Sequence, residues 1–217
     1  MPNIDIIQAL AKKEKKPEEL FDKVIKDRRL LPTVLDGTTA TKANIKYGST
    51  KILRLISEKD PKVLYPKMDF FIKMMDSENQ ILKWNGMDIV ANLLVVDSKK
   101  KFDKIFDKYY SLLSDEVMIT AGHVIDNSGK IVMAKPNFKD KITQHLLEVE
   151  KVSRNQECQN ILIGKTILAL SSYFDQMKDN DKTKVISFVR KHLNNTRPAT
   201  RKKAERFLDK VQRKRSK

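Results

Sequence analysis

The sequence predicts an all-α protein, a right-handed α-solenoid of about five helix pairs with no β-sheet. Three observations predict this fold. Five segments resemble one another at intervals of about 37 to 42 residues, amphipathic helical stripes lie between them, and no stretch alternates apolar and polar residues convincingly as a half-buried strand does. The composition agrees, because only 6 Gly and 7 Pro occur among 217 residues and both residue types disfavour helices.

The five similar segments are expected to form the second helix of each pair. Each has a small residue in its middle, followed by paired apolar residues, and the small residue is expected to let neighbouring helices lie close together. Residues 90–96 are apolar enough for a strand, but they continue a helical period, so we expect a helix there. The segments begin at Thr41, Gln80, Val117, Asn160 and Pro198.

The stretches between these segments are expected to form the first helices of the pairs. Each carries apolar residues at helical spacing on one face and charged residues opposite, as expected for a helix that packs on one side. The apolar stripes run over residues 64–75, 102–113, 138–149 and 185–193.

Helix boundaries are predicted from capping residues. Asp60 precedes Pro61, which places a capping carboxylate before a proline at the first helical position. Ser77 and Ser153 each begin a Ser-x-x-Gln pattern that is typical of a capping box. Gly37 is expected to adopt the left-handed conformation that ends many helices.

The chain divides into three predicted parts. Residues 1–37 are expected to form an N-terminal helix and a degenerate capping repeat, because Pro17 and Pro32 interrupt the helical pattern and terminal repeats must cover the open core. Residues 38–213 are expected to form the repeat array, which ends in a basic helix. Residues 214–217 are predicted to be a basic tail.

The repeats resemble those of HEAT-repeat proteins. The resemblance covers roughly residues 38–213 and lies in the paired helices, their period near that of HEAT and armadillo arrays, and particular stretches of sequence. Residues 121–131 and 134–142 are similar to uncharacterised microbial HEAT-repeat proteins, and residues 196–208 resemble the end of such an array. The resemblance implies five HEAT- or armadillo-like helix pairs and carries almost no information on function.

The sequence offers no clear catalytic, metal or cofactor site. A single cysteine, Cys158, and three scattered histidines lack the spacing of metal ligands. Gly164, Lys165 and Thr166 resemble the end of a phosphate-binding loop, but the apolar residues 161–163 before them predict a helix in which Gly164 serves packing. We therefore predict no catalytic residue, no metal and no cofactor.

The lone cysteine also excludes an internal disulfide, which favours a reducing, cytoplasmic location. No apolar run approaches the roughly 20 residues that cross a bilayer, so no membrane association is predicted.

The formal net charge of +16 is concentrated at one end of the chain. Residues 190–217 contain twelve Lys or Arg against Glu205 and Asp209, a balance of +10, which leaves +6 for the other 189 residues. Such a charge favours an acidic partner or a nucleic acid. The candidate binding residues are Lys42, Lys46, Lys51, Lys83, Arg201, Lys202, Lys203, Arg206, Lys210, Arg213, Lys214 and Arg215.

An aromatic and acidic cluster suggests one enzymatic alternative. Tyr47 and Trp84 occupy matching repeat positions, and Asp88 lies one helical turn after Trp84. HEAT-like alkylpurine DNA glycosylases use aromatic residues and a carboxylate around the damaged nucleotide, but their full catalytic set does not match this sequence. The alternative for Tyr47 and Trp84 is ordinary packing between repeats.

Two functions follow from these features. The first is a non-catalytic scaffold that binds a protein partner, of which an acidic protein is one candidate. The second is binding of DNA or RNA through phosphate contacts, with glycosylase activity as a minor variant of it.

Overall fold

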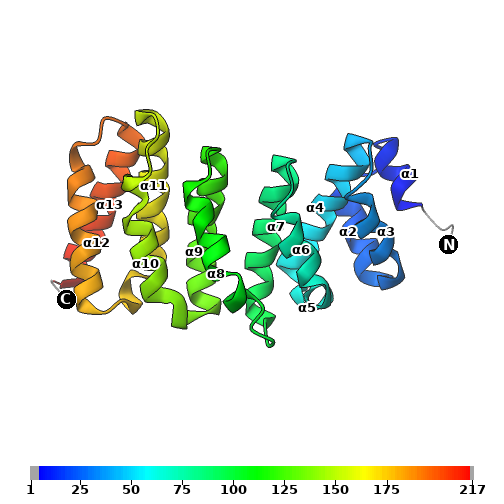
Figure 1. Cartoon of the computed structure of the whole chain (residues 1–217), viewed down its shortest axis with the longest axis horizontal. Coiled ribbons are helices and arrows are strands. Elements are labelled where there is room, and N and C mark those ends of the chain that lie inside the picture. Colours follow the sequence, from blue (N-terminus) through cyan, green and yellow to red (C-terminus); the bar gives the residue numbers. More distant parts are fainter. Residues whose placement is uncertain (1–4, 216–217) are drawn as a thin grey trace. The chain divides into compact units, whose positions relative to one another are not determined.

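The computed structural model describes residues 5–215, except for the side chains of residues 214 and 215 (Figure 1). Every regular element in that range is an α-helix or a short 3-10 helix, which confirms the all-α prediction. The chain forms two compact units, residues 1–104 and 105–217.

The first unit is built around α4 (Ala43–Lys59), a long helix that packs against α1, α2, α3, α5 and α7. The helix α7 packs in addition against α6. The other helices are α1 (Ile6–Ala11), α2 (Pro17–Lys26), α3 (Leu31–Gly37), α5 (Pro61–Leu64), α6 (Met68–Met74) and α7 (Gln80–Leu93). Short 3-10 helices are η1 (Arg28–Leu30), η2 (Tyr65–Lys67), η3 (Leu94–Val96) and η4 (Phe102–Lys104).

The second unit contains a row of three long helices, in which α11 packs between α9 and α13. The shorter helix α10 packs on α9, α11 and α12, and α12 packs on α13. The helices are α8 (Phe106–Ser111), α9 (Met118–Ala134), α10 (Lys139–Leu147), α11 (Gln156–Tyr173), α12 (Asp179–Lys191) and α13 (Pro198–Arg215). The 3-10 helices are η5 (Leu112–Ser114), η6 (Pro136–Phe138), η7 (Val149–Lys151), η8 (Phe174–Gln176) and η9 (His192–Asn194).

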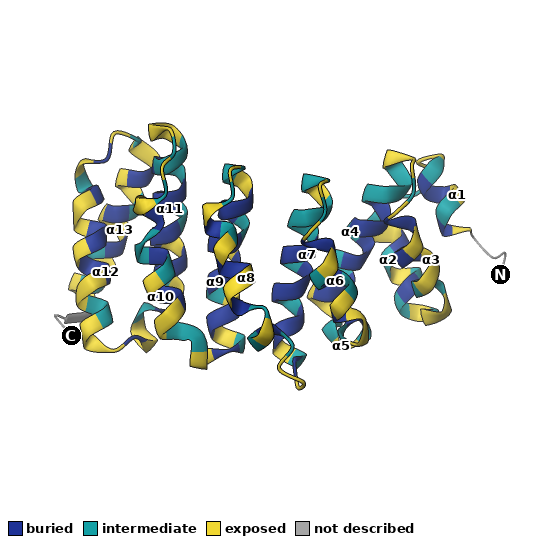
Figure 2. Ribbon diagram, viewed as in Figure 1, coloured by how far each residue is buried: buried dark blue, intermediate teal, exposed yellow. Residues whose placement is uncertain are grey.

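The predicted second helices correspond to α4, α7, α9, α11 and α13, so each of the five segments is confirmed as a helix. Residues 90–96 are helical as expected, in α7 and η3. Each unit buries an apolar core between its helices (Figure 2). In the first unit, Leu53 of α4 and Val90 of α7 are fully buried, as are Val124 of α9 and Leu162 of α11 in the second.

Polar side-chain contacts join segments of each unit that are far apart in the sequence. In the first unit, the Tyr65 hydroxyl donates a hydrogen bond to Asp97 Oδ1 at 2.8 Å, across 32 residues of sequence. In the second unit, Asn195 Nδ2 donates to Asn160 Oδ1 at 2.9 Å, across 35 residues. Both separations are slightly shorter than the interval at which the sequence segments recur, so each contact joins neighbouring segments at positions that are not equivalent.

Two of the predicted caps are wrong by two residues. Asn79 and Asn155, rather than Ser77 and Ser153, are the N-caps of α7 and α11. Asn79 Oδ1 accepts from the Leu82 N–H at 3.2 Å, and Asn155 Oδ1 accepts from the Cys158 N–H at 2.8 Å. Asparagine caps a helix as well as serine does.

The predicted left-handed conformation of Gly37 is also wrong, because no described glycine has a positive φ. The helix α3 ends at Gly37, where a Cβ would collide with the Ser49 side chain of α4. The glycine therefore serves close packing of α3 on α4.

At α5, Pro61 occupies the first helical position as predicted. The Asp60 carboxylate, however, accepts a hydrogen bond from Arg28 at 3.2 Å instead of capping the helix.

Over the part of the chain that the structure describes, none of the helices combines the length and the apolar character needed to cross a lipid bilayer.

Candidate protein-binding face

The basic residues predicted on the last helix surround a buried stripe of α13. Ala204 and Phe207 are buried, as the apolar pattern predicts, whereas Lys202, Arg206 and Lys210 are exposed. The exposed residues also include Arg213. Arg201 donates a hydrogen bond from Nη1 to the Asn195 carbonyl at 3.3 Å. The side chains of Lys214 and Arg215 lie outside the described residues.

Lys203 differs from the other α13 cations because it leans on α11. A Cβ placed on Gly164 would lie 3.5 Å from Lys203 Cδ and 3.4 Å from its Nζ. The pKa of Lys203 is lowered, first by burial and then by the positive charges of Lys165 and Arg197, although Asp126 opposes the shift. The cations Lys165, Arg197 and Lys203 therefore gather at the α11–α13 seam, where the carboxylates Asp126 and Glu157 offset two of the three charges.

A similar arrangement joins α11 to α9. The Lys165 side chain passes over Gly122, where an added Cβ would lie 3.4 Å from Lys165 Cε, and its ammonium pairs with Asp126. Near the start of α11, Glu157 pairs with Arg197, which precedes α13. The three long helices are thus tied together by charged side chains on one surface.

We call this surface the α9–α11–α13 face. Positions three or four residues apart on a helix share one side, and the contacts of Lys165 and Lys203 place one such side of each helix on the same surface. The face consists of Ile119, Asp126 and Met133 of α9, Lys165 and Leu168 of α11, and Lys203, Arg206 and Lys210 of α13.

Three large apolar side chains of this face are exposed to solvent. Ile119 is 46% exposed, Leu168 53% and Met133 63%. Among residues 105–213 these are the large apolar side chains with high exposure, and all three lie on the α9–α11–α13 face. Met133 Sδ accepts a weak hydrogen bond from Gln176 Nε2 at 3.2 Å. The face therefore combines apolar contacts with positive charge, a pairing found in protein interfaces.

The predicted basic residues of the first unit lie on α4, at its start, and on α7. Lys42 is exposed immediately before α4, and Lys46 is half-buried on that helix. Lys51 Nζ pairs with Glu18 of α2 at 2.5 Å. Lys83 is half-buried on α7.

The aromatic and acidic residues take part in contacts between α4 and α7. The Tyr47 hydroxyl accepts a hydrogen bond from Asn79 Nδ2 at 3.0 Å, which holds the N-cap of α7. Asp88 Oδ2 lies 4.0 Å from Arg54 Nη1 of α4, and Trp84 is half-buried on α7. Tyr47 and Asp88 thus connect neighbouring helices, as the packing interpretation expects. Within residues 5–213, no three His, Cys, Asp or Glu side chains gather as metal ligands do.

Sequence reasoning did not identify the exposed apolar residues as candidates. Leu168 lies in a run from residue 161 to 170 that is apolar almost all round, so its period does not reveal which side is covered. The available signal was the single charge in that run, Lys165, which lies one turn before Leu168 and marks the uncovered side.

Comparisons of this chain with protein-family models, with curated proteins and with solved structures found no match.

Proposed function

We propose that this protein is a non-catalytic binding module, a right-handed HEAT-like α-solenoid that binds a protein partner through its α9–α11–α13 face. The packing of successive long helices supports the solenoid arrangement, because α4 packs on α7 in the first unit and α11 packs between α9 and α13 in the second. Stacked repeats of this kind present long helical surfaces that are suited to binding.

The observation that carries the proposal is the exposure of Ile119, Leu168 and Met133 on one face. Single exposed apolar residues are ordinary, but a group on one face favours a partner that covers it. The cations Lys203, Arg206 and Lys210 flank the group and favour acidic residues on the partner. The partner is therefore expected to present leucine-like side chains next to carboxylates, as an acidic amphipathic helix does.

A protein fits this face better than a phosphate backbone does. Lys165 of this face and Arg197, which precedes α13, are already paired with Asp126 and Glu157. A nucleic acid would have to separate these pairs and would leave the apolar side chains unused.

The test uses a fluorescent helical peptide of about 18 residues, with leucine on one side and glutamate on the other. Fluorescence anisotropy measures its binding to the wild-type chain and to Leu168→Asp. The matched control is Val95→Asp, because Val95 is 68% exposed and belongs to the first unit. We expect binding to weaken at least about tenfold in Leu168→Asp and to stay unchanged in Val95→Asp. Equal binding by both variants would exclude this face as the site.

Nucleic-acid binding remains the alternative, favoured by the exposed cations Lys202, Arg206, Lys210 and Arg213 of α13. Phosphate binding predicts a linear fall of log affinity with log salt concentration, by roughly one unit of slope per contact. A titration with random duplex DNA between about 50 and 200 mM salt measures that slope. A steep slope, removed when Arg206 and Lys210 are changed to glutamate, would favour the alternative over the protein partner.

A further inference from the structure

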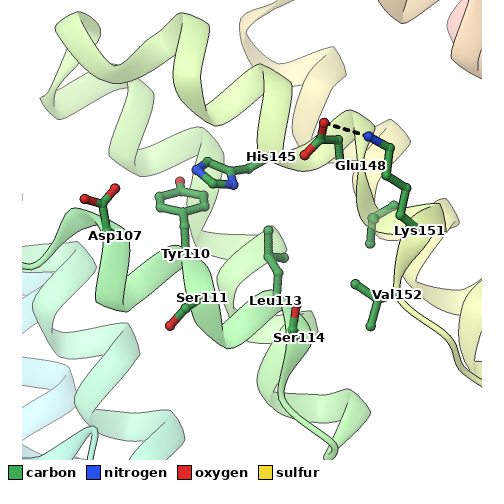
Figure 3. Close-up of a pocket in the computed structure, with 10 residues that line it drawn as sticks. Asp107, Tyr110, Ser111, Leu113, Ser114, His145, Glu148, Lys151 and Val152 are labelled. Atoms are coloured by element: carbon green, nitrogen blue, oxygen red, sulfur yellow. Dashed lines mark hydrogen bonds and ion pairs between the residues drawn. The ribbon is translucent and has the colours of Figure 1, made fainter.

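A groove opens on a different side of the second unit, between α8 with η5 and the end of α10 with η7 (Figure 3). Its volume is about 510 Å³, within the range of sites that bind small ligands or peptide side chains. It is lined by Asp107, Tyr110, Ser111, Leu113, Ser114, His145, Glu148, Val149, Lys151 and Val152. We call it the α8–α10 groove.

The groove continues into a second hollow of about 310 Å³, because Ser114 and Val152 line both. The remaining residues of this hollow are Asp115, Glu116, Met118, Ser153, Arg154, Asn155 and Cys158. The two hollows together form a trough along the helix ends, which suits an extended peptide better than a compact ligand.

The walls of the trough are held in place by hydrogen bonds. Arg154 Nη2 donates to the carbonyl oxygens of Leu113 and Asp115, both at 2.8 Å, and so ties the segment before α11 to the turn between η5 and α9. Gln159 Nε2 donates to the Val149 carbonyl at 3.0 Å. A peptide can therefore bind without first ordering these walls, which lowers the entropic cost of binding.

The trough is acidic although the chain as a whole carries +16. Asp107, Asp115, Glu116 and Glu148 line it, against the two cations Lys151 and Arg154. The Arg154 guanidinium is directed to backbone carbonyls, and Lys151 Nζ pairs with Glu148 at 2.8 Å. That hydrogen bond lowers the pKa of Glu148, which keeps the carboxylate ionised. Asp107 and Glu116 are exposed at the rim.

The interior of the groove provides surfaces for the stem and head of a cationic side chain. The imidazole of His145 stacks on the Tyr110 ring, with centroids 5.3 Å apart and planes 21° apart, and Figure 3 shows this pair between Asp107 and Glu148. Tyr110 itself is buried, so the half-buried His145 ring is the aromatic surface that the groove offers. A flat guanidinium stacks well on such a ring and pairs with a carboxylate in its plane. The half-buried Val152 provides an apolar surface for its methylene groups, whereas Val149 is buried.

We propose that the α8–α10 groove binds an extended peptide segment of a partner protein that carries arginine side chains. The charge of the trough, opposite in sign to that of the chain, selects a cationic segment and repels nucleic acid. The half-buried His145 ring favours arginine over lysine. This site is separate from the α9–α11–α13 face, so either proposal can fail without the other.

The first test uses the wild-type chain and a fluorescent peptide of about ten residues in which arginine alternates with alanine. In an extended conformation such a peptide is about 30 Å long. The matched peptide has citrulline in place of arginine, which keeps the shape and removes the charge. We expect the arginine peptide to bind at least about tenfold more tightly in anisotropy titrations. Equal binding of the two peptides, or none by either, would overturn the proposal.

The second test locates the binding site. Asp107→Lys with Glu116→Lys reverses two rim charges of the trough, and Glu205→Lys with Asp209→Lys makes the same net change on exposed positions of α13. We expect the first pair to weaken binding of the arginine peptide at least about tenfold and the second pair less than about twofold. Equal weakening would show that only net charge matters, and would overturn the proposal.

A second copy of this chain, with its own basic residues, is the competing occupant. Sedimentation of the wild-type protein tests it directly. A single monomeric species supports the partner peptide, whereas a concentration-dependent dimer that is lost in Asp107→Lys with Glu116→Lys would assign the groove to self-association.

Discussion

The Lys203 side chain lies across the backbone of Gly164, so that α13 contacts α11 where a side chain on α11 is missing. A Cβ on Gly164 would also lie 2.7 Å from Thr200 Oγ1, a hydroxyl that is buried and donates to the Asn160 carbonyl at 2.7 Å. At Gly122, by contrast, the nearest atom is the flexible end of Lys165, at 3.4 Å. The two glycines therefore differ in how firmly they are covered.

We predict that Gly164→Leu lowers the free energy of unfolding by about 2 to 3 kcal/mol, because Thr200 and its hydrogen bond would have to move. Urea denaturation followed by circular dichroism measures the change. The control Gly122→Ala is expected to stabilise the protein by up to about 1 kcal/mol, because alanine favours a helix and Lys165 can move aside. Equal effects of the two variants would show that α13 does not close over α11 at Gly164.

The buried side chain of Asn160 joins α11 to the segment before α13. Its Oδ1 accepts from Asn195 Nδ2 at 2.9 Å and its Nδ2 donates to Thr196 Oγ1 at 2.9 Å. We predict that Asn160→Leu costs about 2 to 3 kcal/mol, because it leaves the buried Asn195 amide without this partner. The control is Asn137→Leu, the same substitution at an exposed position. It is expected to alter the unfolding free energy by less than about 0.5 kcal/mol. A stable Asn160→Leu protein would contradict the role assigned to this contact.

The sequence was sufficient to predict the positions of the long helices, because a small residue followed by paired apolar residues recurs at a regular interval. It was less informative at the helix ends, where Ser77 and Asn79 are equally good caps and only the direction of the preceding chain decides between them. The exposed side of α11 was not predicted, since Leu168 and its buried neighbour Ile167 are chemically alike. The α8–α10 groove was not predicted either, because it depends on Arg154 reaching carbonyls about 40 residues away, at Leu113 and Asp115.

Tyr47 provides a test between the packing and glycosylase interpretations of the first unit. We predict that Tyr47→Phe lowers the unfolding free energy by about 1 kcal/mol, because Asn79 Nδ2 loses its hydrogen bond to the hydroxyl. Equilibrium denaturation measures the loss. The glycosylase interpretation instead predicts that wild-type protein releases alkylated purines from duplex DNA, and that Trp84→Ala abolishes this release. Unchanged stability of Tyr47→Phe together with base release by the wild type would contradict the packing interpretation.

His192 makes stability depend on pH. Its ring is buried in η9, edge-on to Phe188 at 4.9 Å between ring centroids. Burial lowers the pKa of His192, although the Glu150 carboxylate, 3.3 Å from Nε2, opposes the shift and Lys191 reinforces it. The unfolded chain then binds a proton at a higher pH than the folded chain does, so the contribution of His192 to stability is complete above about pH 6.5 and falls as the pH is lowered from there.

We predict that the unfolding free energy of the wild type falls between about pH 7.5 and 5.5, and that it falls less in His192→Gln. The two proteins are compared by urea denaturation at both pH values, and the difference between their slopes isolates His192 from the other titrating groups. Identical slopes would contradict a lowered pKa for this side chain.

The most direct test of the proposed function is methyl NMR of the protein labelled at Ile, Leu, Val and Met during a titration with the acidic amphipathic peptide. We expect shift changes that centre on Ile119, Met133 and Leu168, with none at Ile81 and Val95, the exposed large apolar residues described in the first unit. Shift changes confined to Ile81 and Val95, or no change at peptide concentrations up to about 1 mM, would contradict binding through the α9–α11–α13 face.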